Sequence, residues 1–580
     1  MSIDTIRHSF SHIMAAAVLE IYPEAKFGIG PSIDNGFYYD IKIKENLKQD
    51  DLEKISKVMK EIIERKIEFE RQEISRREAN DLFKDQPYKV ELVKEIPDSE
   101  NISIYKVGKF VDLCRGPHVQ STNNLNSEAF TLLHVSTAYW KGDQKEDTLQ
   151  RIYGTAWTSK KELKRYLHLL EEAKKRDHRK IGRELDLFSQ PGDIGSGLVL
   201  FHPKGAIIRK TIENFELDEH LKRGYQYVYT PHIYKADVWK LSGHYTFYKD
   251  NMFLFKAFEQ EYGLKPMNCP GHVMIYKSRS RSYRDLPIKY FELGTVYRRE
   301  LSGVLQGLLR VTSITQDDAH IFCRKDQLEE EINKVIKFAI FMMETFGFEY
   351  KFTLSTKPEK SLGSDEIWKL ATDALKNALK KNELKYDIEE GGGAFYGPKI
   401  DVNMKDAINR WWQGPTIQID FNFPERFNLE FVNSNGEKER PVMIHRTVLG
   451  SMERFMGVLI EHYAGRYPLW LAPVQVKLLT ILNEERIVHY AEELNKKFLE
   501  EKIRSELDIS SNTLNYKIRA AQNERIPYVI VLGERELEEN KISLRIGKKG
   551  ITKNMIELPI FIKQIKEEIN NKINESIFLK

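Results

Sequence analysis

Hydrophobic positions recur with helical spacing in the first part of the chain. Between residues 51 and 82, apolar side chains follow one another at intervals of three and four among charged positions, which is typical of a helix with one buried face. We therefore expect a long charged helix near 51–82, followed by strands. The repeating apolar residues are Leu52, Ile55, Val58, Met59, Ile62 and Ile63. With a short N-terminal helix and glycine turns, this pattern predicts an α+β domain over residues 1–158.

The next segments predict a linker and a larger domain. Residues 159–180 keep helical periodicity but end in a dense basic run, which indicates a connecting helix. Over 181–471, helical segments alternate with strand-like segments rich in Tyr, Phe and Ile, interrupted by glycine and proline turns. We expect this region to be a single mixed domain.

After Pro473 the pattern changes once more. It predicts a strand at Val474–Leu482, a helix at Glu485–Lys502 and a buried strand at Ile526–Leu532. Residues 472–580 should therefore form a compact α/β domain.

Composition narrows the possible functions. The 580 residues are 41% hydrophobic and 30% charged, which is typical of a globular protein. Lys plus Arg at 90 nearly balances Asp plus Glu at 86, so nucleic-acid binding would need local basic patches. No apolar run approaches the roughly 20 residues of a membrane span, and three scattered cysteines suit a reducing compartment. We expect a cytosolic location.

The stretch from Tyr297 to His320 carries candidate chemistry. No P-loop and no strand-linked Gly-x-Gly-x-x-Gly is present, so a bound ATP would have to be held by arginines. Gln316, Asp318 and His320 alternate along a predicted strand and would share one face, able to hold a small zwitterion beside a nucleotide. The alternative is a charged hairpin with a solvated face.

Histidines and cysteines in the first domain pair at short spacing. His8 and His12 lie one turn apart on a helix face, and Cys114 precedes His118 by four residues. These four groups indicate a candidate zinc site, and the alternative is ordinary packing.

Two motifs carry a resemblance to a known family. Met267-Asn-Cys-Pro-Gly-His272 and Thr315-Gln-Asp-Asp-Ala-His320 are similar to those of threonyl-tRNA synthetases, which are class II aminoacyl-tRNA synthetases. The similarity runs from Arg7 to the Arg545 region. It implies a multidomain α+β protein in which an antiparallel-sheet catalytic core lies between an N-terminal α+β editing domain and a C-terminal α/β anticodon-binding domain.

The resemblance assigns the ATP site and the subunit interface. A helix and strand ending at Pro231 correspond to the family's dimer interface, so a homodimer is expected. Arg298 resembles the arginine that grips the α-phosphate of Mg²⁺-ATP, Glu300 the adenine contact and Arg454 the arginine on the far phosphates. Arg310 completes this catalytic set. Where relatives carry a phenylalanine that stacks on adenine, this chain has Ile314, which has no π face.

The resemblance also supplies a metal site and a substrate pocket. Cys269, His320 and His445 lie 51 and 125 residues apart, so their spacing alone does not single them out. The family makes them the ligands of one zinc ion per subunit, with an open position for threonine. Further lining residues follow from the family's motifs. Gln316, Asp318 and Tyr396 are the expected threonine contacts, and Lys399, Gln413, Thr416, Gln418 and Ser451 the remaining substrate-binding residues.

A coordinated hydroxyl distinguishes threonine from valine, which an apolar pocket separates by only about 100-fold. Serine has the same hydroxyl on a smaller side chain, so errors with serine are expected. The N-terminal domain resembles the family's editing domain, which hydrolyses Ser-tRNA(Thr). We expect no bound metal in it. Its expected residues are His8, His12, Lys89, Asp112, Cys114 and His118. The anticodon-reading residues would be Arg519, Glu536 and Arg545, with surface ion pairing as the alternative.

The resemblance as a whole implies an enzyme, a threonine–tRNA ligase that uses ATP and edits Ser-tRNA(Thr). Many relatives have an additional small β-rich domain in front, but this chain begins seven residues before His8, so we expect a form without it. The alternatives are a non-catalytic RNA-binding regulator and a free-standing editing hydrolase.

Overall fold

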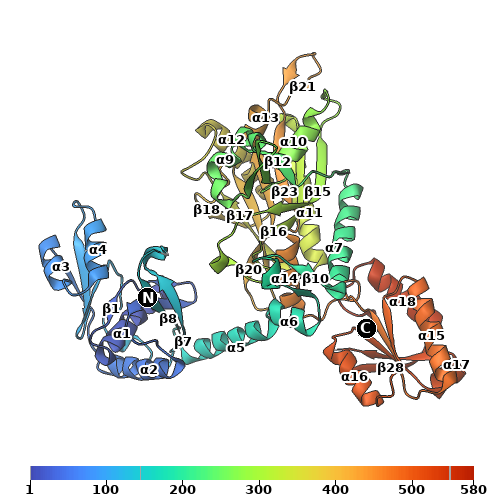
Figure 1. Cartoon of the computed structure of the whole chain (residues 1–580), viewed down its shortest axis with the longest axis horizontal. Coiled ribbons are helices and arrows are strands. Elements are labelled where there is room, and N and C mark those ends of the chain that lie inside the picture. The colour runs from blue at the N-terminus through green and yellow to red at the C-terminus, as the bar shows by residue number, and fades with distance from the viewer. Residues whose placement is uncertain (1, 144, 548–549, 580) are drawn as a thin grey trace. The chain divides into compact units, whose positions relative to one another are not determined.

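The computed structural model describes residues 2–143, 145–547 and 550–579. Its contacts divide the chain into two units, Met1–Glu172 and Ala173–Lys580. The division falls inside the helix α5 (Lys160–Arg176), which can be followed in Figure 1. A short helix, α6 (His178–Glu184), follows directly, with Asp177 as its N-cap. The segment expected at 159–180 is therefore helical, but it contains the whole of α5 and the start of a second helix, α6.

The first unit is an α+β domain built on two sheets. One has the strand order β1-β3-β8-β7 with β2 paired to β3, and the other has the order β4-β5-β6. Helix α1 is almost wholly buried over Ile6–Val18, including His12, and Ser2 caps its start by accepting a bond from Thr5 N–H. The strands are β1 (Lys26–Phe27), β2 (Ser32–Ile33), β3 (Gly36–Lys42), β4 (Glu70–Ile74), β5 (Ile102–Val107), β6 (Phe110–Leu113), β7 (Phe130–Tyr139) and β8 (Thr148–Ala156), and the helices are α1 (Ile3–Ile21), α2 (Gln49–Glu64), α3 (Arg76–Leu82) and α4 (Pro87–Glu95).

The long helix expected near 51–82 is wrong in extent. α2 ends at Glu64, and the rest of the range forms β4 and α3. Lys66 adopts a φ of 55°, a left-handed conformation that a right-handed helix cannot contain. The charged residues after it pair with β5 as a largely exposed edge strand.

An eight-stranded sheet organises the middle of the chain. Its order is β11-β15-β16-β23-β20-β19-β17-β18, and the pairing is antiparallel except for β11 with β15 and β17 with β18. The class II core expected from the sequence is an antiparallel sheet, so this expectation is confirmed. The strands are β11 (Gln226–Tyr227), β15 (Ile288–Tyr297), β16 (Ser313–Cys323), β17 (Glu349–Ser355), β18 (Tyr386–Glu389), β19 (Lys399–Lys405), β20 (Trp411–Asp420) and β23 (Val442–Thr447).

The two faces of this sheet have different neighbours. Ala319 and Ile321 of β16 join the main apolar core, which also holds residues of α7, α11, α12 and α14. The alternate residues Gln316, Asp318 and His320 lie on the other face, as their spacing predicted. Near this face, α10 packs through Val273 and Tyr276 against a smaller apolar cluster. The helices are α7 (Pro203–Lys222), α8 (Ala236–Ser242), α9 (His244–Phe247), α10 (Cys269–Lys277), α11 (Leu328–Thr345), α12 (Asp365–Lys381), α13 (Asn422–Arg426) and α14 (Met452–Tyr463).

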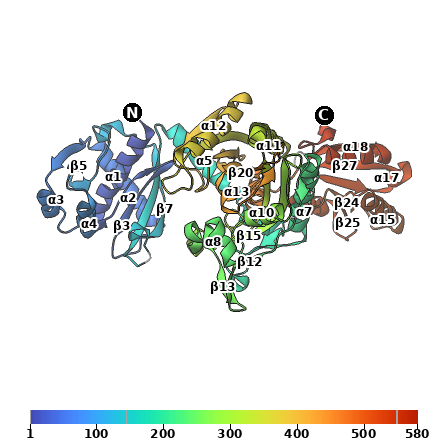
Figure 2. The same ribbon diagram turned by 90° about the horizontal axis from the view of Figure 1, so that it is seen from above.

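Smaller sheets accompany the eight-stranded sheet in the second unit. Figure 2 shows β12 and β13, with α8, projecting from the side of the large sheet. In these sheets β9 (Phe188–Ser189) pairs with β10 (Leu200–Phe201), β14 (Gln260–Leu264) lies between β12 (Ile233–Lys235) and β13 (Leu254–Ala257), and β21 (Phe431–Val432) pairs with β22 (Lys438–Glu439).

The C-terminal residues form an α/β domain around a sheet of order β25-β24-β26-β27-β28. One face packs on α15 and α18 through Leu494 and Phe561, and the other on α16 through Ala521 (Figure 1). Within the described residues, no helix has both the length and the apolar character that a bilayer span requires. The strands are β24 (Val476–Thr480), β25 (Ser505–Asp508), β26 (Tyr528–Leu532), β27 (Lys541–Ile546) and β28 (Ile551–Glu557), and the helices are α15 (Glu485–Glu500), α16 (Leu514–Asn523), α17 (Glu534–Glu539) and α18 (Leu558–Asn570).

Candidate functional site

A cavity of about 360 Å³ opens on the polar face of the large sheet. Most of the residues predicted for threonine, ATP and zinc line it, although they come from segments far apart in the sequence. The predicted residues in the lining are Cys269, Arg298, Gln316, Asp318, His320, Tyr396, Gln413, Thr416, Gln418, His445, Ser451 and Arg454. Ile314 lines it too. Glu300, Arg310 and Lys399 are outside this lining.

One thiol and two imidazoles converge in the wall of the cavity. Strand pairing sets His320 of β16 directly opposite His445 of β23, and Cys269 begins α10 beside them. The ligating atoms of the three residues lie within 4.8 Å of one another, and all three side chains are buried. Burial raises the pKa of the Cys269 thiol and lowers that of His320. His320 is therefore neutral, the form in which imidazole binds a metal.

The outer nitrogens of these histidines have partners of their own. His445 Nε2 lies 3.0 Å from Asp420 Oδ2, and His320 Nδ1 lies 2.8 Å from His272 Nδ1. His272 Nε2 in turn lies 3.2 Å from Glu292 Oε2. His320 Nε2 and His445 Nδ1 are left facing each other at 3.0 Å. Such second partners orient metal-ligating histidines, so the donor set fits a zinc ion.

Polar residues beside the trio are held in place by their neighbours. Asn268 donates to Asp318 Oδ2 over 3.1 Å, and Tyr396 donates its hydroxyl proton to Gln418 Oε1. A carboxylate and an amide fixed in this way suit an ammonium group.

Asp401, which the sequence did not single out, gathers three of the predicted substrate-binding residues. Gln413 Nε2 and Thr416 Oγ1 each donate to Asp401 Oδ1 over 2.8 Å, and Lys399 Nζ lies 2.8 Å from Oδ2. Lys399 therefore reaches the cavity wall through Asp401.

Arginines concentrate positive charge in and beside the same cavity. The pKa of Arg454 is lowered, first by burial and then by the charges of Arg298 and Arg310. Glu300 is the carboxylate that opposes this effect, and it is paired with Arg310 over 2.8 Å. Arg454 Nε donates to the Leu309 carbonyl over 3.1 Å. Crowded guanidinium groups of this kind suit a polyphosphate.

The buried face of β16 carries Asp317, which supports a turn beside the cavity. Asp317 accepts hydrogen bonds from the N–H groups of Val448, Leu449 and Gly450, so it holds the turn that leads into Ser451, the N-cap of α14. Asp317 alternates with the cavity-facing residues Gln316 and Asp318, and its partners lie about 130 residues later in the sequence.

The predicted editing residues also come together, in the first unit. Cys114 Sγ lies 3.4 Å from His8 Nε2 and 3.3 Å from His118 Nε2. Their ligating atoms and one of His12 lie within 4.8 Å of one another. Burial lowers the pKa of all three imidazoles and raises that of Cys114 to about 12. The cluster therefore consists of neutral groups at pH 7.

A buried ion pair lies next to this cluster. Lys89 and Asp112 are each 2% exposed and pair through Lys89 Nζ and Asp112 Oδ1. The other oxygen of Asp112 lies 3.2 Å from His12 Nε2 and accepts the hydroxyl proton of Tyr39 over 2.5 Å. Tyr39, which the sequence did not single out, also accepts a bond from Lys89 Nζ over 3.1 Å.

The three predicted anticodon residues differ in exposure. Arg519 is exposed on α16 and Arg545 is half-buried on β27. Glu536 is buried and accepts bonds from Gly533 N–H and the Ser543 hydroxyl, over 3.0 and 2.6 Å. These bonds fix the start of α17, and the expected role of Glu536 in reading bases stays a prediction.

Three family models match successive parts of the chain. Residues 102–153 match the threonyl and alanyl tRNA synthetase second additional domain, 253–463 the class II tRNA synthetase core domain (G, H, P, S and T), and 471–568 an anticodon-binding domain. Together with the antiparallel sheet and its arginine-lined cavity, these matches define a class II aminoacyl-tRNA synthetase.

Similar proteins narrow the family. The chain is 51% identical to the threonine–tRNA ligase of Clostridium tetani, covering 99% of the chain and 89% of that protein. It is 53% identical to that of Oleidesulfovibrio alaskensis, covering 94% and 84%. A solved structure of the RNA-binding domain of threonyl-tRNA synthetase from Cryptosporidium parvum is 41% identical, with a TM-score of 0.66, over 68% of this chain and 98% of that one. The chain belongs to the threonine–tRNA ligase family.

Proposed function

We propose that the chain activates threonine with Mg²⁺-ATP, transfers it to tRNA(Thr), and hydrolyses Ser-tRNA(Thr) in its first unit. One observation carries the synthetic part of the proposal. A single cavity combines the trio Cys269, His320 and His445 with the guanidinium groups of Arg298 and Arg454. These are the groups needed to select a hydroxy amino acid and to hold a triphosphate beside it.

The trio would hold one zinc ion, which when bound supplies Lewis-acid contacts for the amino group and the hydroxyl of threonine. Gln316 and Asp318, on the same strand face as His320, orient the ammonium group, with Asn268 holding the Asp318 carboxylate. Valine lacks the hydroxyl and is rejected more strongly than an apolar pocket would allow.

Arg298 and Arg454 act on the phosphates. When the threonine carboxylate attacks the α-phosphorus and pyrophosphate leaves, negative charge builds up on the phosphate oxygens. Fixed guanidinium charges stabilise that transition state because they never lose their protons. A ribose hydroxyl of the tRNA's terminal adenosine then attacks the threonyl carbonyl, and AMP departs.

Editing requires a second, hydrolytic site, and the cluster in the first unit supports one. His8, His12 and His118 are neutral and can accept a proton from water. Lys89 and Asp112 add a buried pair of charges beside them. We propose that this cluster orients the water that hydrolyses the seryl ester, without a bound metal.

An exposed apolar surface around α7 supports the homodimer. Ile207, Leu221, Tyr229 and Ile233 are 42%, 51%, 77% and 48% exposed, and they lie on or just after the helix that the family uses for its subunit interface. A subunit interface over this segment would remove these apolar side chains from water. The cytosolic location stays a prediction.

Threonine-dependent exchange of pyrophosphate into ATP tests the synthetic proposal. With zinc and magnesium present, threonine should support rapid exchange, serine slower exchange and valine the least. Ser-tRNA(Thr) should be deacylated by the chain, whereas Thr-tRNA(Thr) should persist. No exchange with threonine would instead favour the RNA-binding regulator, which neither the family nor the arginine-lined cavity favours.

A further inference from the structure

The end of the linker contacts the loop that precedes Arg310. His178, the first residue of α6, is 1% exposed, and the Leu308 N–H donates to its Nε2 over 3.0 Å. The approach is close. A Cβ atom on Gly307, whose φ is 48°, would lie 2.1 Å from His178 Nε2. Gly307 therefore allows the loop backbone to reach the imidazole.

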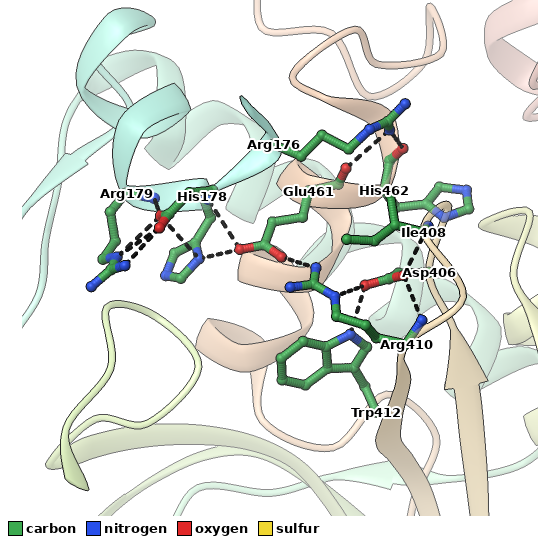
Figure 3. A network of polar contacts seen from close by, with 10 residues as sticks. Arg176, His178, Arg179, Asp406, Ile408, Arg410, Trp412, Glu461 and His462 are labelled. Carbon is green, nitrogen blue, oxygen red and sulfur yellow. Dashed lines mark hydrogen bonds and ion pairs between the residues drawn. The ribbon is translucent and has the colours of Figure 1, made fainter. Parts of the chain in front are cut away.

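Glu461 fixes the ring in the orientation that this contact needs. Its Oε1 lies 2.7 Å from His178 Nδ1 and accepts the His178 backbone N–H over 3.1 Å. Because Nε2 accepts from Leu308, the ring proton is on Nδ1, where Glu461 accepts it. Figure 3 shows His178 and Arg410 reaching the Glu461 carboxylate from different segments.

Glu461 is itself held by charge. Burial alone would raise its pKa, but the bond from His178 and the charge of Arg410 lower it, so the carboxylate is ionised. Arg410 is braced by Asp406 through Nε over 2.7 Å, and Asp406 also accepts the Trp412 indole N–H over 3.0 Å (Figure 3). The His178 ring is therefore hydrogen-bonded to a network of paired charges formed by Glu461, Arg410 and Asp406.

The same loop supports an ATP-site arginine. Leu309 directly follows Leu308, and its carbonyl accepts the bond from Arg454 Nε. Leu308 is fully buried, and a Cβ on Gly457 of α14 would meet Leu308 and Leu309 side chains at 3.2 and 3.1 Å. The loop is therefore clamped between His178 and α14, with Arg454 attached to it.

We propose that His178 is a positioning residue for ATP activation. By accepting the Leu308 N–H, it fixes the Leu308–Leu309 backbone, and through the Leu309 carbonyl it fixes the guanidinium group of Arg454. Glu461 serves this contact by holding the imidazole proton on Nδ1. The inference rests on the proposed role of Arg454 at the ATP phosphates and adds a residue outside the cavity on which that role depends.

Two amide substitutions test the roles of the two ring nitrogens of His178 separately. In His178→Gln the amide can replace Nε2 as acceptor for Leu308, whereas in His178→Asn the amide can replace only the Nδ1 donor to Glu461. We expect His178→Asn to lower kcat/KM for ATP about tenfold in threonine-dependent exchange, the effect of leaving one buried donor unpaired. His178→Gln should remain within about threefold of the wild-type value, and KM for threonine should not change in either variant.

Lys180→Ala is the matched control on the same helix, because the Lys180 side chain is exposed and its Nζ lies 3.9 Å from Glu184 Oε1. It should leave exchange unchanged. Thermal unfolding and active-site titration of each full-length variant separate positioning from lost folding, because unfolded enzyme lowers the number of sites without changing KM for ATP.

The inference is overturned if His178→Asn keeps kcat/KM for ATP within twofold, if His178→Gln is as impaired as His178→Asn, or if only the number of active sites falls. Arg454→Ala, measured in parallel, distinguishes failure of the positioning role of His178 from failure of the proposed ATP site. Loss of exchange there with normal His178→Asn kinetics refutes the positioning role alone, whereas full exchange in Arg454→Ala refutes the proposed ATP site itself.

Discussion

Within the described residues, two clusters combine one thiol with two or three imidazoles, and their surroundings differ. Beside Cys269, His320 and His445 lie Asp318 and Asp420, whose negative charges act on the thiol. Beside Cys114 the nearest carboxylate, Asp112, is already paired with Lys89.

A cation is therefore favoured in the first cluster and opposed by Lys89 in the second. Cys114 Sγ also accepts the Gly116 N–H over 3.2 Å and contacts two imidazoles. The comparison teaches that similar donor groups are suited to different tasks according to the charges around them: binding a metal in one case, and handling water and protons in the other.

Substituting the cysteine of each cluster should give the largest difference between the two clusters. Cys269→Ala should lower threonine-dependent exchange at least about 100-fold, because several kcal/mol of interaction depend on the ion that it helps to hold. Cys114→Ala should leave exchange within about twofold, since it lies in the other unit. Equal losses in the two variants would mean that the clusters are not functionally separate.

The buried pair beside the editing cluster provides a second test. Asp112→Asn leaves Lys89 as an unpaired buried charge, which should destabilise the first unit by about 3–5 kcal/mol. Calorimetry of the full-length protein should show an earlier transition for part of the chain, and deacylation of Ser-tRNA(Thr) should be lost while exchange continues. Wild-type deacylation in this variant would contradict the role of the pair.

The pH dependence of editing sharpens the contrast. Burial lowers the pKa of His8 and His12, so both rings are neutral above the ordinary histidine value of about 6.5. Hydrolysis that uses neutral imidazole is then fully active at pH 6.5–8 and falls only as the pH drops further. Single-turnover deacylation should give a flat profile over that range. A sigmoidal rise centred near pH 6.5 would contradict the buried, neutral cluster.

The smallest expected effect concerns Ile314, which lines the synthetic cavity. Replacing it with phenylalanine offers an aromatic face to adenine, worth about 0.5–1.5 kcal/mol. KM for ATP in the exchange reaction should fall a few-fold in Ile314→Phe, with deacylation unaffected. An increase in KM would show that this wall of the cavity does not contact the base.

Local periodicity predicted the parts of both sites that lie on single elements. The alternation of Gln316, Asp318 and His320 and the one-turn spacing of His8 and His12 both correspond to the structure. Partners brought together by the tertiary fold could not be predicted in this way. Asp420 supports His445 across paired strands, and His178 meets Leu308 across 130 residues of sequence.

The helix expected near 51–82 failed for a related reason. Apolar spacing does not reveal the left-handed backbone at Lys66 or the pairing of β4 with β5. Tertiary pairing overrode a local helical signal there.

Zinc content of the purified protein tests the central claim most directly. Elemental analysis should find one zinc per chain in the wild type and in Cys114→Ala, and none in Cys269→Ala. Zinc that persists in Cys269→Ala, or that is lost in Cys114→Ala, would contradict the assignment of the metal to the synthetic cavity.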